Sequence, residues 1–109
     1  LTDDRPDEAV ELLRRGLRLA PTTTEARKQL MGILFKQGRW AELELEAETL
    51  LSYAPDDAET HNLMGVALAS QDRLGRAHEH FDASVRLYPT NAEARANLAA
   101  VNALVNSQP

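Results

Sequence analysis

The sequence predicts an all-α protein, an α-solenoid of about six helices arranged in antiparallel pairs. Prolines recur 34 residues apart, at Pro21, Pro55 and Pro89, and a fixed period of this length is typical of repeat architectures. Three further columns keep the same register: Glu25, Glu59 and Glu93; Arg5, Arg39 and Arg73; Leu17, Leu51 and Val85. A second break inside each unit, at KQGRW and SQDRL, divides the unit into two helices.

The first three helices are expected at residues 6–19, 24–36 and 40–52. Pro21 ends the first helix, because proline cannot continue a helix and also restricts the residue before it. Thr22 then opens the second helix three residues before a glutamate, which is a capping-box pattern. Gly38 marks the tight turn between the second helix and the third.

The last three helices follow the same pattern, at residues 58–70, 74–87 and 92–105. Asp56 and Thr90 occupy the capping-box position after their prolines. Asp72 marks the tight turn inside this unit. Each 34-residue unit is therefore predicted to be two helices with short connections.

Residues 42–48, ELELEAE, alternate charged and apolar side chains, a pattern that taken alone indicates a half-buried strand. All of these residues are nonetheless strong helix formers. On a helix that turns by about 100° per residue, one face gathers Trp40, Leu43, Ala47, Leu50 and Leu51. Because only Leu45 falls on the opposite side, we predict a helix with Leu45 exposed.

Composition narrows the classes of function. The 109 residues carry a formal net charge of −5 and no cysteine, which fits one small domain without a disulfide or a thiolate metal site. An acidic chain argues against nucleic acid as a partner. No apolar run approaches the ~20 residues needed for membrane insertion. The chain opens on Leu1, so its natural N-terminus is expected upstream, and ten arginines against two lysines suggest a bacterial genome rich in GC.

The repeating unit resembles that of the tetratricopeptide repeat (TPR) family, with its L-G, A-x3-F and P pattern. The unit at 58–91 fits best, through Gly65, Ala77, Phe81 and Pro89. The resemblance covers nearly the whole chain and implies a right-handed superhelix forming a single domain fragment over residues 1–109. Its expected parts are the second helix of a repeat at 1–21, full repeats at 24–57 and 58–91, and a terminal capping helix at 92–105.

The unit at 24–57 departs from the family pattern. Met31 replaces the small residue and Gly32 follows it, while Ala47 stands where the next unit has Phe81. Because large and small are exchanged with volume roughly conserved, the change is of a tolerated kind. We expect this helix pair to pack at a slightly different distance or angle.

A second departure is the column Arg27, His61 and Arg95, where the family usually has a large apolar side chain. Their stems are expected to snorkel over the core, with the polar ends in water. Asn102 is also polar, in the column that holds Leu34 and Leu68. A polar residue there suits a helix that caps the stack.

The residues do not suggest catalysis. The three histidines are His61, His78 and His80, and the last two, at i and i+2, point to different sides of a helix. A structural or solvated histidine is the commoner reading, since metal ligands would lie at i and i+4 or in tight clusters. No glycine-rich phosphate loop or calcium loop is present in the sequence. We therefore expect a protein that is not an enzyme, with no cofactor and no metal.

The TPR resemblance implies that the protein binds a peptide or partner protein on its concave face, which the first helix of each unit lines. The predicted lining is Glu25, Lys28, Gly32, Phe35, Lys36, Asn62, Val66, Ala69, Ser70 and Asn97. Among these, Lys28, Asn62 and Asn97 can hydrogen-bond an extended peptide backbone.

The carboxylate clamp of TPR co-chaperones is not expected. Lys28 matches its first lysine, but its asparagines fall on Gly32 and Leu63. Its later lysine and arginine fall on Glu93 and Asn97, and Glu93 would repel a carboxylate.

A second candidate surface is an acidic ridge formed by Glu42, Leu45 and Glu46. It belongs to a block in which no lysine or arginine occurs between Trp40 and Asp72. A solvated outer face is the commoner explanation of such a block, and a docking patch for a basic partner is the functional one.

Three functions stay open at this point. The first is a scaffold, as a segment of a larger bacterial assembly, secretion or export protein, in the cytoplasm or periplasm. The second is a regulatory or substrate-docking appendage of an enzyme such as a glycosyltransferase or sulfotransferase. The third is head-to-tail self-association, in which the helices at 92–105 and 6–19 of two copies complete a repeat.

Overall fold

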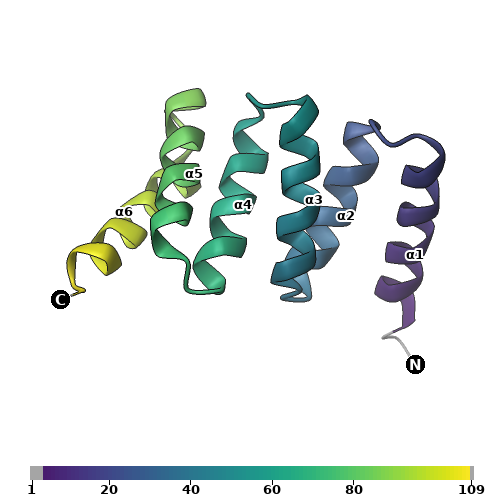
Figure 1. Cartoon of the computed structure of the whole chain (residues 1–109), viewed down its shortest axis with the longest axis horizontal. Coiled ribbons are helices and arrows are strands. Elements are labelled where there is room, and N and C mark those ends of the chain that lie inside the picture. Colours follow the sequence, from purple (N-terminus) through teal and green to yellow (C-terminus); the bar gives the residue numbers. More distant parts are fainter. Residues whose placement is uncertain (1–3, 109) are drawn as a thin grey trace.

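The computed structural model describes residues 4–108, which form six helices joined by short connections and, within that range, no strand. The helices are α1 (Asp4–Leu19), α2 (Thr24–Lys36), α3 (Trp40–Tyr53), α4 (Ala58–Ser70), α5 (Leu74–Leu87) and α6 (Ala92–Asn106). Figure 1 shows them standing in a row from α1 to α6. Each helix predicted from the sequence is confirmed, with its ends within two residues of the prediction.

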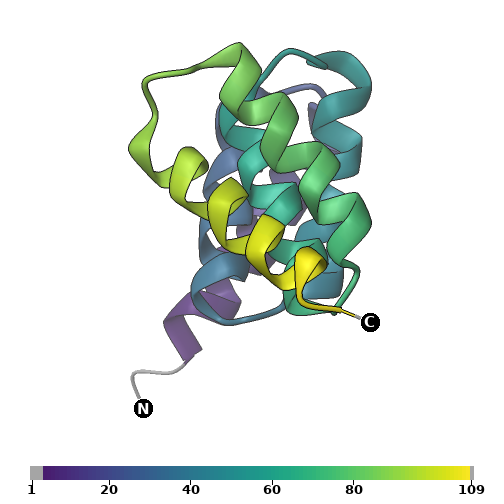
Figure 2. The ribbon, with the colours of Figure 1, turned by 90° about the vertical axis from the view of Figure 1, so that its left-hand side faces the viewer.

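The row is curved, and its helices form two layers. The backbones of α2 and α4, and of α4 and α6, approach each other closely, whereas in the described part of the chain α1, α3 and α5 touch one another only through long side chains. Because the inside of a curved stack brings its helices closer together, α2, α4 and α6 form the inner layer. Figure 2, which views the stack from the C-terminal end, shows α6 crossing in front of the other helices. The molecule measures 43 × 31 × 22 Å.

The two turns inside the units adopt the left-handed backbone conformation. Gly38 has φ 66° and Asp72 has φ 65°. Glycine reaches this region without a steric cost, and aspartate is one of the few other residues that visit it. Both turns predicted from the sequence are confirmed.

The predicted capping residues were placed one position too early. The N-cap positions of α2, α4 and α6 are held by Thr23, Asp57 and Asn91, not by Thr22, Asp56 and Thr90, and the side chains of Asp57 and Asn91 accept capping hydrogen bonds whereas that of Thr23 does not. Asp57 Oδ1 accepts from the Thr60 amide at 3.0 Å, and Asn91 Oδ1 accepts from the Glu93 and Ala94 amides at 3.0 and 3.2 Å.

A turn before each cap explains this shift. The capping residue donates its own amide to the carbonyl three residues earlier, as in Asp57 to Ala54 at 3.3 Å and Asn91 to Tyr88 at 3.2 Å. The turn uses one residue more than a proline followed directly by a cap would need. The glutamates at 25, 59 and 93 therefore lie at the second helical position, one place short of the capping-box position.

The core runs along the stack between the two layers. Its fully buried side chains include Leu30 and Leu34 of α2, Leu43 and Leu50 of α3, and Leu68 of α4. Residues 42–48 are helical, and Leu45 is 62% exposed, as predicted. The alternating pattern of ELELEAE is thus produced by one surface leucine in a helix.

Residue sizes are exchanged between the two full repeats, as predicted. A Cβ atom on Gly65 would lie 2.5 Å from the ring of Phe81, so this close approach of α4 and α5 requires glycine. In the other repeat, Met31 and Ala47 are both fully buried. Helices α2 and α3 make much less extensive contact than α4 and α5, which agrees with the expected difference in packing.

Candidate functional site

The polar column on the inner helices has a structural role that its sequence position did not reveal. Each member donates a hydrogen bond to the carbonyl of the proline six residues earlier: Arg27 to Pro21 at 2.6 Å, His61 to Pro55 at 2.8 Å and Arg95 to Pro89 at 3.4 Å. Since each bond joins the first turns of an inner helix to the loop before it, the column fixes the connection between successive repeats.

Arg27 corrects the expectation that this column snorkels. Its side chain does not reach into water, because the residue is only 7% exposed. Its guanidinium donates to Glu46 Oε1 and to the hydroxyl of Tyr53, and Arg14 Nη1 donates to Glu46 Oε2 at 2.9 Å. A carboxylate between two guanidiniums thus links α1, α2 and α3 below the surface.

The predicted acidic ridge is not an open acidic surface. Glu46 is buried in the pair just described, and Glu42 accepts two hydrogen bonds from Arg39, both at 2.8 Å, and one from Arg14 at 2.9 Å. The hydrogen bonds from Arg39 hold the pKa of Glu42 below its usual value, against the opposing effect of burial. Only Leu45 of the three predicted residues lies in the open.

Arginines from α1, from α5 and from the turn before α5 pair with the glutamates of α3. Glu44 contacts Arg73 and Arg76 of the α4–α5 turn and α5, while Arg14 approaches from α1. The block looked unpaired because these arginines lie 28 to 32 residues away along the chain.

All ten residues predicted to line the concave face lie on α2, α4 or α6. Their accessibility differs. Glu25, Phe35, Lys36 and Ser70 are exposed, Asn62 is buried, and the remaining five are half-buried. The ring of Phe35 packs edge-on against Trp40, with ring centroids 5.8 Å apart.

The polar side chains predicted to hold a peptide backbone are already engaged within the chain. Lys28 Nζ lies 2.7 Å from Asp57 Oδ2 and 3.2 Å from Glu59 Oε1, and Asn97 Nδ2 donates to Asn62 Oδ1 at 3.1 Å. These contacts join α2 to α4 and α4 to α6. They stabilise the inner layer and leave fewer polar groups for a ligand.

The Lys28–Asp57 pair also shifts both pKa values. Burial alone would lower the pKa of Lys28, but the carboxylates of Asp57 and Glu59 outweigh it and raise that pKa. Burial alone would raise the pKa of Asp57, yet hydrogen bonds from Lys28 and Thr60 lower it. Both groups are therefore charged at neutral pH.

Two hollows open on the inner layer. The larger, about 560 Å³, lies between α1 and α2 and is lined by Ala9, Leu12, Leu13, Gln29, Gly32, Ile33 and Lys36. The smaller, about 250 Å³, lies between α4 and α6 and is lined by Val66, Ala69, Ser70, Phe81, Asn97, Ala100, Val101 and Leu104. Six of the ten residues predicted for the concave face line one or other of these hollows.

The α1 wall of the larger hollow was not predicted from the sequence. Leu12 is 64% exposed and lies on α1, the second helix of a repeat, whereas the TPR resemblance assigns the lining of the concave face to first helices. In DEAVELLRRGL, Val10 and Leu17 form the buried stripe of the helix, and Leu12 is an additional apolar residue outside that stripe. This additional apolar residue was the signal in the sequence.

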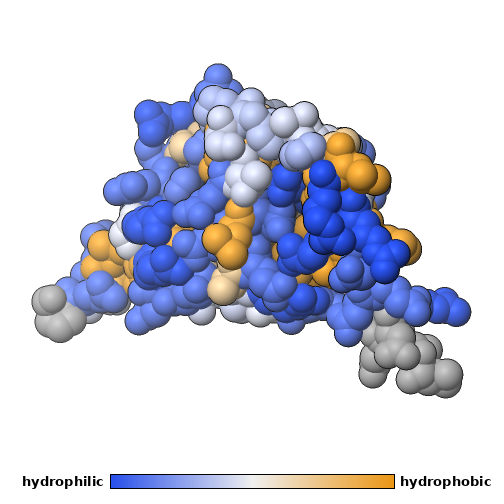
Figure 3. All heavy atoms as spheres, turned by 45° about the vertical axis from the view of Figure 1, so that its right-hand side comes forward, coloured by the Kyte–Doolittle hydropathy of each residue, from blue (hydrophilic) through white to orange (hydrophobic). Residues whose placement is uncertain are grey.

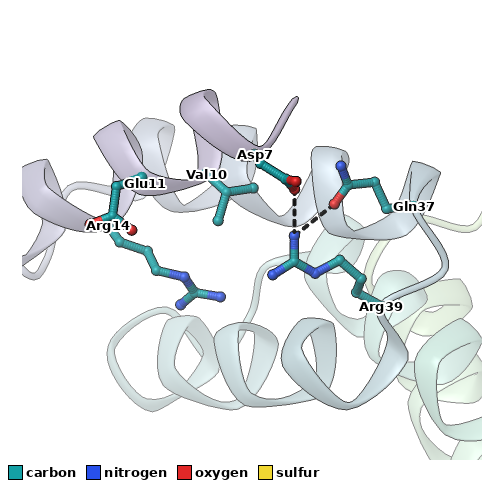
Figure 4. A pocket seen from close by; sticks show the side chains of 6 residues that line it. All are labelled: Asp7, Val10, Glu11, Arg14, Gln37 and Arg39. Atoms are coloured by element: carbon teal, nitrogen blue, oxygen red, sulfur yellow. Dashed lines mark hydrogen bonds and ion pairs between the residues drawn. The ribbon is translucent and has the colours of Figure 1, made fainter. Parts of the chain in front are cut away.

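A third hollow, about 630 Å³, lies between α1 and the α2–α3 turn and is polar (Figure 4). Arg39 Nη1 lies 3.5 Å from Asp7 Oδ1 and donates to Gln37 Oε1 at 2.8 Å, and Arg14 extends toward the hollow from α1. Because both arginines are also paired with Glu42, the hollow offers no unbalanced charge to a ligand.

The outer surface is predominantly hydrophilic. Figure 3 shows apolar side chains in small, separate patches among polar ones on the face that it displays. In the part of the chain that the structure describes, no group of three or more His, Asp or Glu side chains could hold a metal ion. No helix among the described residues is long and apolar enough to cross a membrane.

A curved stack of helix pairs with an open inner layer defines a helical repeat protein. The family model of the tetratricopeptide repeat matches residues 1–66, and this chain belongs to that family. TPR units are protein-interaction modules, and membership supports an interaction role for this chain. No curated protein sequence matches the chain at a significant level.

Solved structures of TPR proteins resemble the fold closely. The first TPR domain of Spaghetti (RPAP3), bound to the HSP90 peptide SRMEEVD, has a TM-score of 0.89 at 18% identity, over 97% of this chain and 84% of that chain. MamA from Desulfovibrio magneticus RS-1 has a TM-score of 0.86 at 22% identity, over 96% of this chain and 59% of that chain. A MamA RS-1 double mutant gives 0.88 at 22% identity.

These likenesses confirm the predicted all-α solenoid of TPR type. The chain spans about 60% of the length of the MamA chains that it resembles. At such identities the likeness is one of fold.

Proposed function

We propose that this chain is a non-catalytic scaffold that binds a peptide or a partner protein on its inner layer, formed by α2, α4 and α6. The observation that carries the proposal is the pair of hollows on that layer, which together combine apolar walls with a few polar side chains. A common way to recognise a protein segment is a hydrophobic groove that receives the apolar face of an amphipathic helix.

The hollows favour a partner that contributes apolar side chains. Lys28, Asn62 and Asn97 are engaged inside the chain, so a ligand that relied on them would have to break those contacts. An apolar side chain buried in a hollow would instead contribute about 1.5–3 kcal/mol. We therefore propose apolar anchors as the main source of affinity, with Lys36 and Ser70 at the rims.

The larger hollow is a groove between α1 and α2 into which a helix could pack. Four of its residues, Gln29, Gly32, Ile33 and Lys36, lie two repeat lengths before Asn97, Ala100, Val101 and Leu104. The latter four belong to the α6 wall against which α4 packs. Helices α1 and α2 are thus the equivalents of α5 and α6, two repeats earlier in the chain. Because α4 packs against the α5–α6 pair, an amphipathic helix from a partner is expected to pack against the α1–α2 pair in the same way.

Peptides with an acidic carboxyl end are not expected to bind. The solved RPAP3 domain holds the peptide SRMEEVD. In this chain Lys28 is neutralised by Asp57 and Glu59, and the inner layer exposes Glu25, Glu59 and Glu93. These carboxylates would repel a ligand of that charge.

Self-association is a second candidate, and the same groove between α1 and α2 favours it. Helix α6 of another copy shares the register of α4 and could occupy the groove between α1 and α2. Inside the chain, Arg14 of one outer helix pairs with Glu42 of the next. Where two copies meet, Asp82 would take the position of Arg14, and Glu8 of the next copy would take the position of Glu42. Two carboxylates in place of an ion pair would weaken the contact. We therefore rank association with a different protein first.

In its wider setting, we propose that the chain serves as a segment of a larger bacterial assembly, secretion or export protein. The alternative is an appendage that docks substrates for an enzyme. Both settings use the same inner layer, so the test below applies to either.

A binding test can use two leucines of equal exposure. Peptides selected by display against the chain would be titrated into wild-type protein, Leu12→Glu and Leu45→Glu. Leu12 is 64% exposed in the larger hollow, and Leu45 is 62% exposed on an outer helix, so neither change disturbs the core. Placing a carboxylate in the hollow should weaken binding at least about tenfold, the equivalent of 1.4 kcal/mol, while Leu45→Glu leaves it unchanged. Equal loss in both variants, or loss only in Leu45→Glu, would refute the proposed surface.

A further inference from the structure

Two histidines from neighbouring helices face each other across the second full repeat. His61 of α4 and His80 of α5 approach with their Nδ1 atoms 3.1 Å apart. The ring centroids lie 5.3 Å apart with an interplanar angle of 29°. Because the centroid separation exceeds the nitrogen separation by about one ring diameter, the two nitrogens meet end to end, as in an N–H···N hydrogen bond.

The hydrogen-bond partners determine the tautomers of both rings. His61 Nε2 lies 2.8 Å from the carbonyl oxygen of Pro55, which can only accept, so this nitrogen carries a proton. In its neutral form His61 then has a bare Nδ1. His80 must therefore donate from Nδ1, which gives a relay from His80 through His61 to Pro55.

This arrangement suits a proton better than a metal ion. A metal bound by two imidazoles requires both lone pairs to point at a third position about 2.0–2.1 Å from each nitrogen. Here the two nitrogens point at each other. The described residues also supply no group of three ligands around them.

The pair can accept one added proton and stay closed. That proton enters at His80 Nε2, the shared proton shifts to His61 Nδ1, and the ring-to-ring hydrogen bond persists with its direction reversed. A second added proton would place N–H groups on both Nδ1 atoms, 3.1 Å apart, with no acceptor between them. The closed pair therefore excludes the fully protonated state.

We propose that His61 and His80 form a proton-sensitive clasp between α4 and α5, which opens when both rings are protonated and thereby loosens this repeat in mild acid.

The surroundings of the pair support this behaviour. Burial lowers the pKa of His80, and the positive charges of His61 and Arg76 lower it further, with Glu79 opposing them. Arg76 and Glu79 both lie on α5, and α4 contributes only His61. No charged group of α3 or α6 among the described residues shifts the pKa of His80. The two carboxylates near His61 in sequence, Asp57 and Glu59, are both paired with Lys28.

The acid sensitivity is confined to one repeat. Arg27 and Arg95 occupy the position of His61 in the flanking units and donate to the equivalent proline carbonyls. Arginine stays protonated over the whole working range of pH, so those two connections do not respond to acid. His61 is the one titratable member of this column.

Linkage gives the size of the effect. An unfolded histidine takes up a proton near pH 6.5, whereas the closed clasp excludes its second proton. Stability due to the clasp is therefore fully present above about pH 6.5 and is lost as the pH falls. For each excluded proton, the folding constant should drop up to about tenfold per pH unit below that value.

The test combines a direct observation with a set of matched variants. Nitrogen-15 NMR of the wild-type rings at pH 8 should show a proton on Nε2 of His61 and on Nδ1 of His80. Urea unfolding between pH 5 and 6.5 should show the acid-dependent loss in wild type and in His78→Gln, which changes the third histidine. The loss should disappear in His80→Gln, because the amide of glutamine can accept a hydrogen bond from a protonated His61 as well as donate one to a neutral His61.

Two results would overturn the proposal. One is a proton on Nε2 of both rings at pH 8. The other is a pH dependence in His80→Gln equal to that of wild type over this interval. If His80→Gln fails to fold, the tautomers of the wild-type rings still decide the question.

Discussion

The contact between Gly65 and Phe81 gives the sharpest test of the packing. Substitution Gly65→Ala would place a Cβ atom 2.5, 2.6 and 2.9 Å from three carbons of the Phe81 ring. The ring belongs to a residue only 3% exposed, so it has little room to move. Overpacking of this kind costs about 1–3 kcal/mol, occasionally more. Alanine in a helix interior recovers about 0.5–1 kcal/mol relative to glycine. We expect a net loss of about 1–2 kcal/mol in the free energy of unfolding.

Gly32 supplies the matched control for this prediction. It lies in the equivalent inner helix, and a Cβ atom there would meet nothing within 4 Å. Gly32→Ala should therefore stabilise the protein by about 0.5–1 kcal/mol through helix propensity alone. Urea unfolding followed by circular dichroism measures both changes. If Gly65→Ala proved as stable as wild type, the close approach of α4 and α5 would not be set by glycine, and the packing described for this repeat would be wrong.

Three further predictions concern charge and backbone. Glu46→Gln should destabilise the protein by about 3 kcal/mol, because it leaves a buried guanidinium without its carboxylate. Glu48→Gln is the control: Glu48 belongs to a half-exposed ion pair 4.0 Å long. Its substitution should change the free energy of unfolding in urea by less than about 0.5 kcal/mol. Gly38→Ala should cost about 1–2 kcal/mol and Asp72→Gly should be neutral or stabilising, since both positions have positive φ; a tolerated Gly38→Ala would contradict this. Hydrogen-bond donors lower the pKa of Asp57, so this residue contributes stability above about pH 4 that is lost as the pH falls further. Asp57→Asn keeps a capping side chain and should make stability less dependent on pH in that range. An unchanged dependence on pH would count against the pairing of Asp57 with α2.

The sequence was sufficient to place the helices because one period governs several independent features. Proline, the turn residues and the apolar columns recur together every 34 residues, so an error in one would have been visible in the others. The exposure of Leu45 followed from the same geometry. The caps at Thr23, Asp57 and Asn91 were missed by one residue, since a backbone turn inserted before each helix leaves no side-chain pattern of its own.

Long-range pairing could not be predicted in the same way. Glu46 is buried because Arg14 and Arg27 approach it from helices 32 and 19 residues away along the chain. Nothing within the acidic block itself indicates those partners. Lys28 was placed correctly on the inner layer, but its contact with Asp57 depends on the distance between α2 and α4, which the repeat length does not specify.

The candidate site shows the same division. The repeat register predicted which helices line the inner layer, and all ten predicted residues lie there. It did not predict which of them are engaged in internal contacts, nor that Leu12 of an outer helix would form a wall of the larger hollow. These features depend on how neighbouring helices pack, which the repeat length does not specify, and they decide what chemistry a partner must bring.

The measurement that bears most directly on the proposed binding is an NMR titration of the nitrogen-15-labelled chain with a peptide selected for affinity. If the inner layer holds the partner, the amide signals that move most will be those of Gly32, Lys36, Ala69 and Asn97, together with Leu12 at the edge of the larger hollow. Shifts confined to the outer helices, around Leu45 or Arg73, would contradict the account and transfer the binding function to the opposite face.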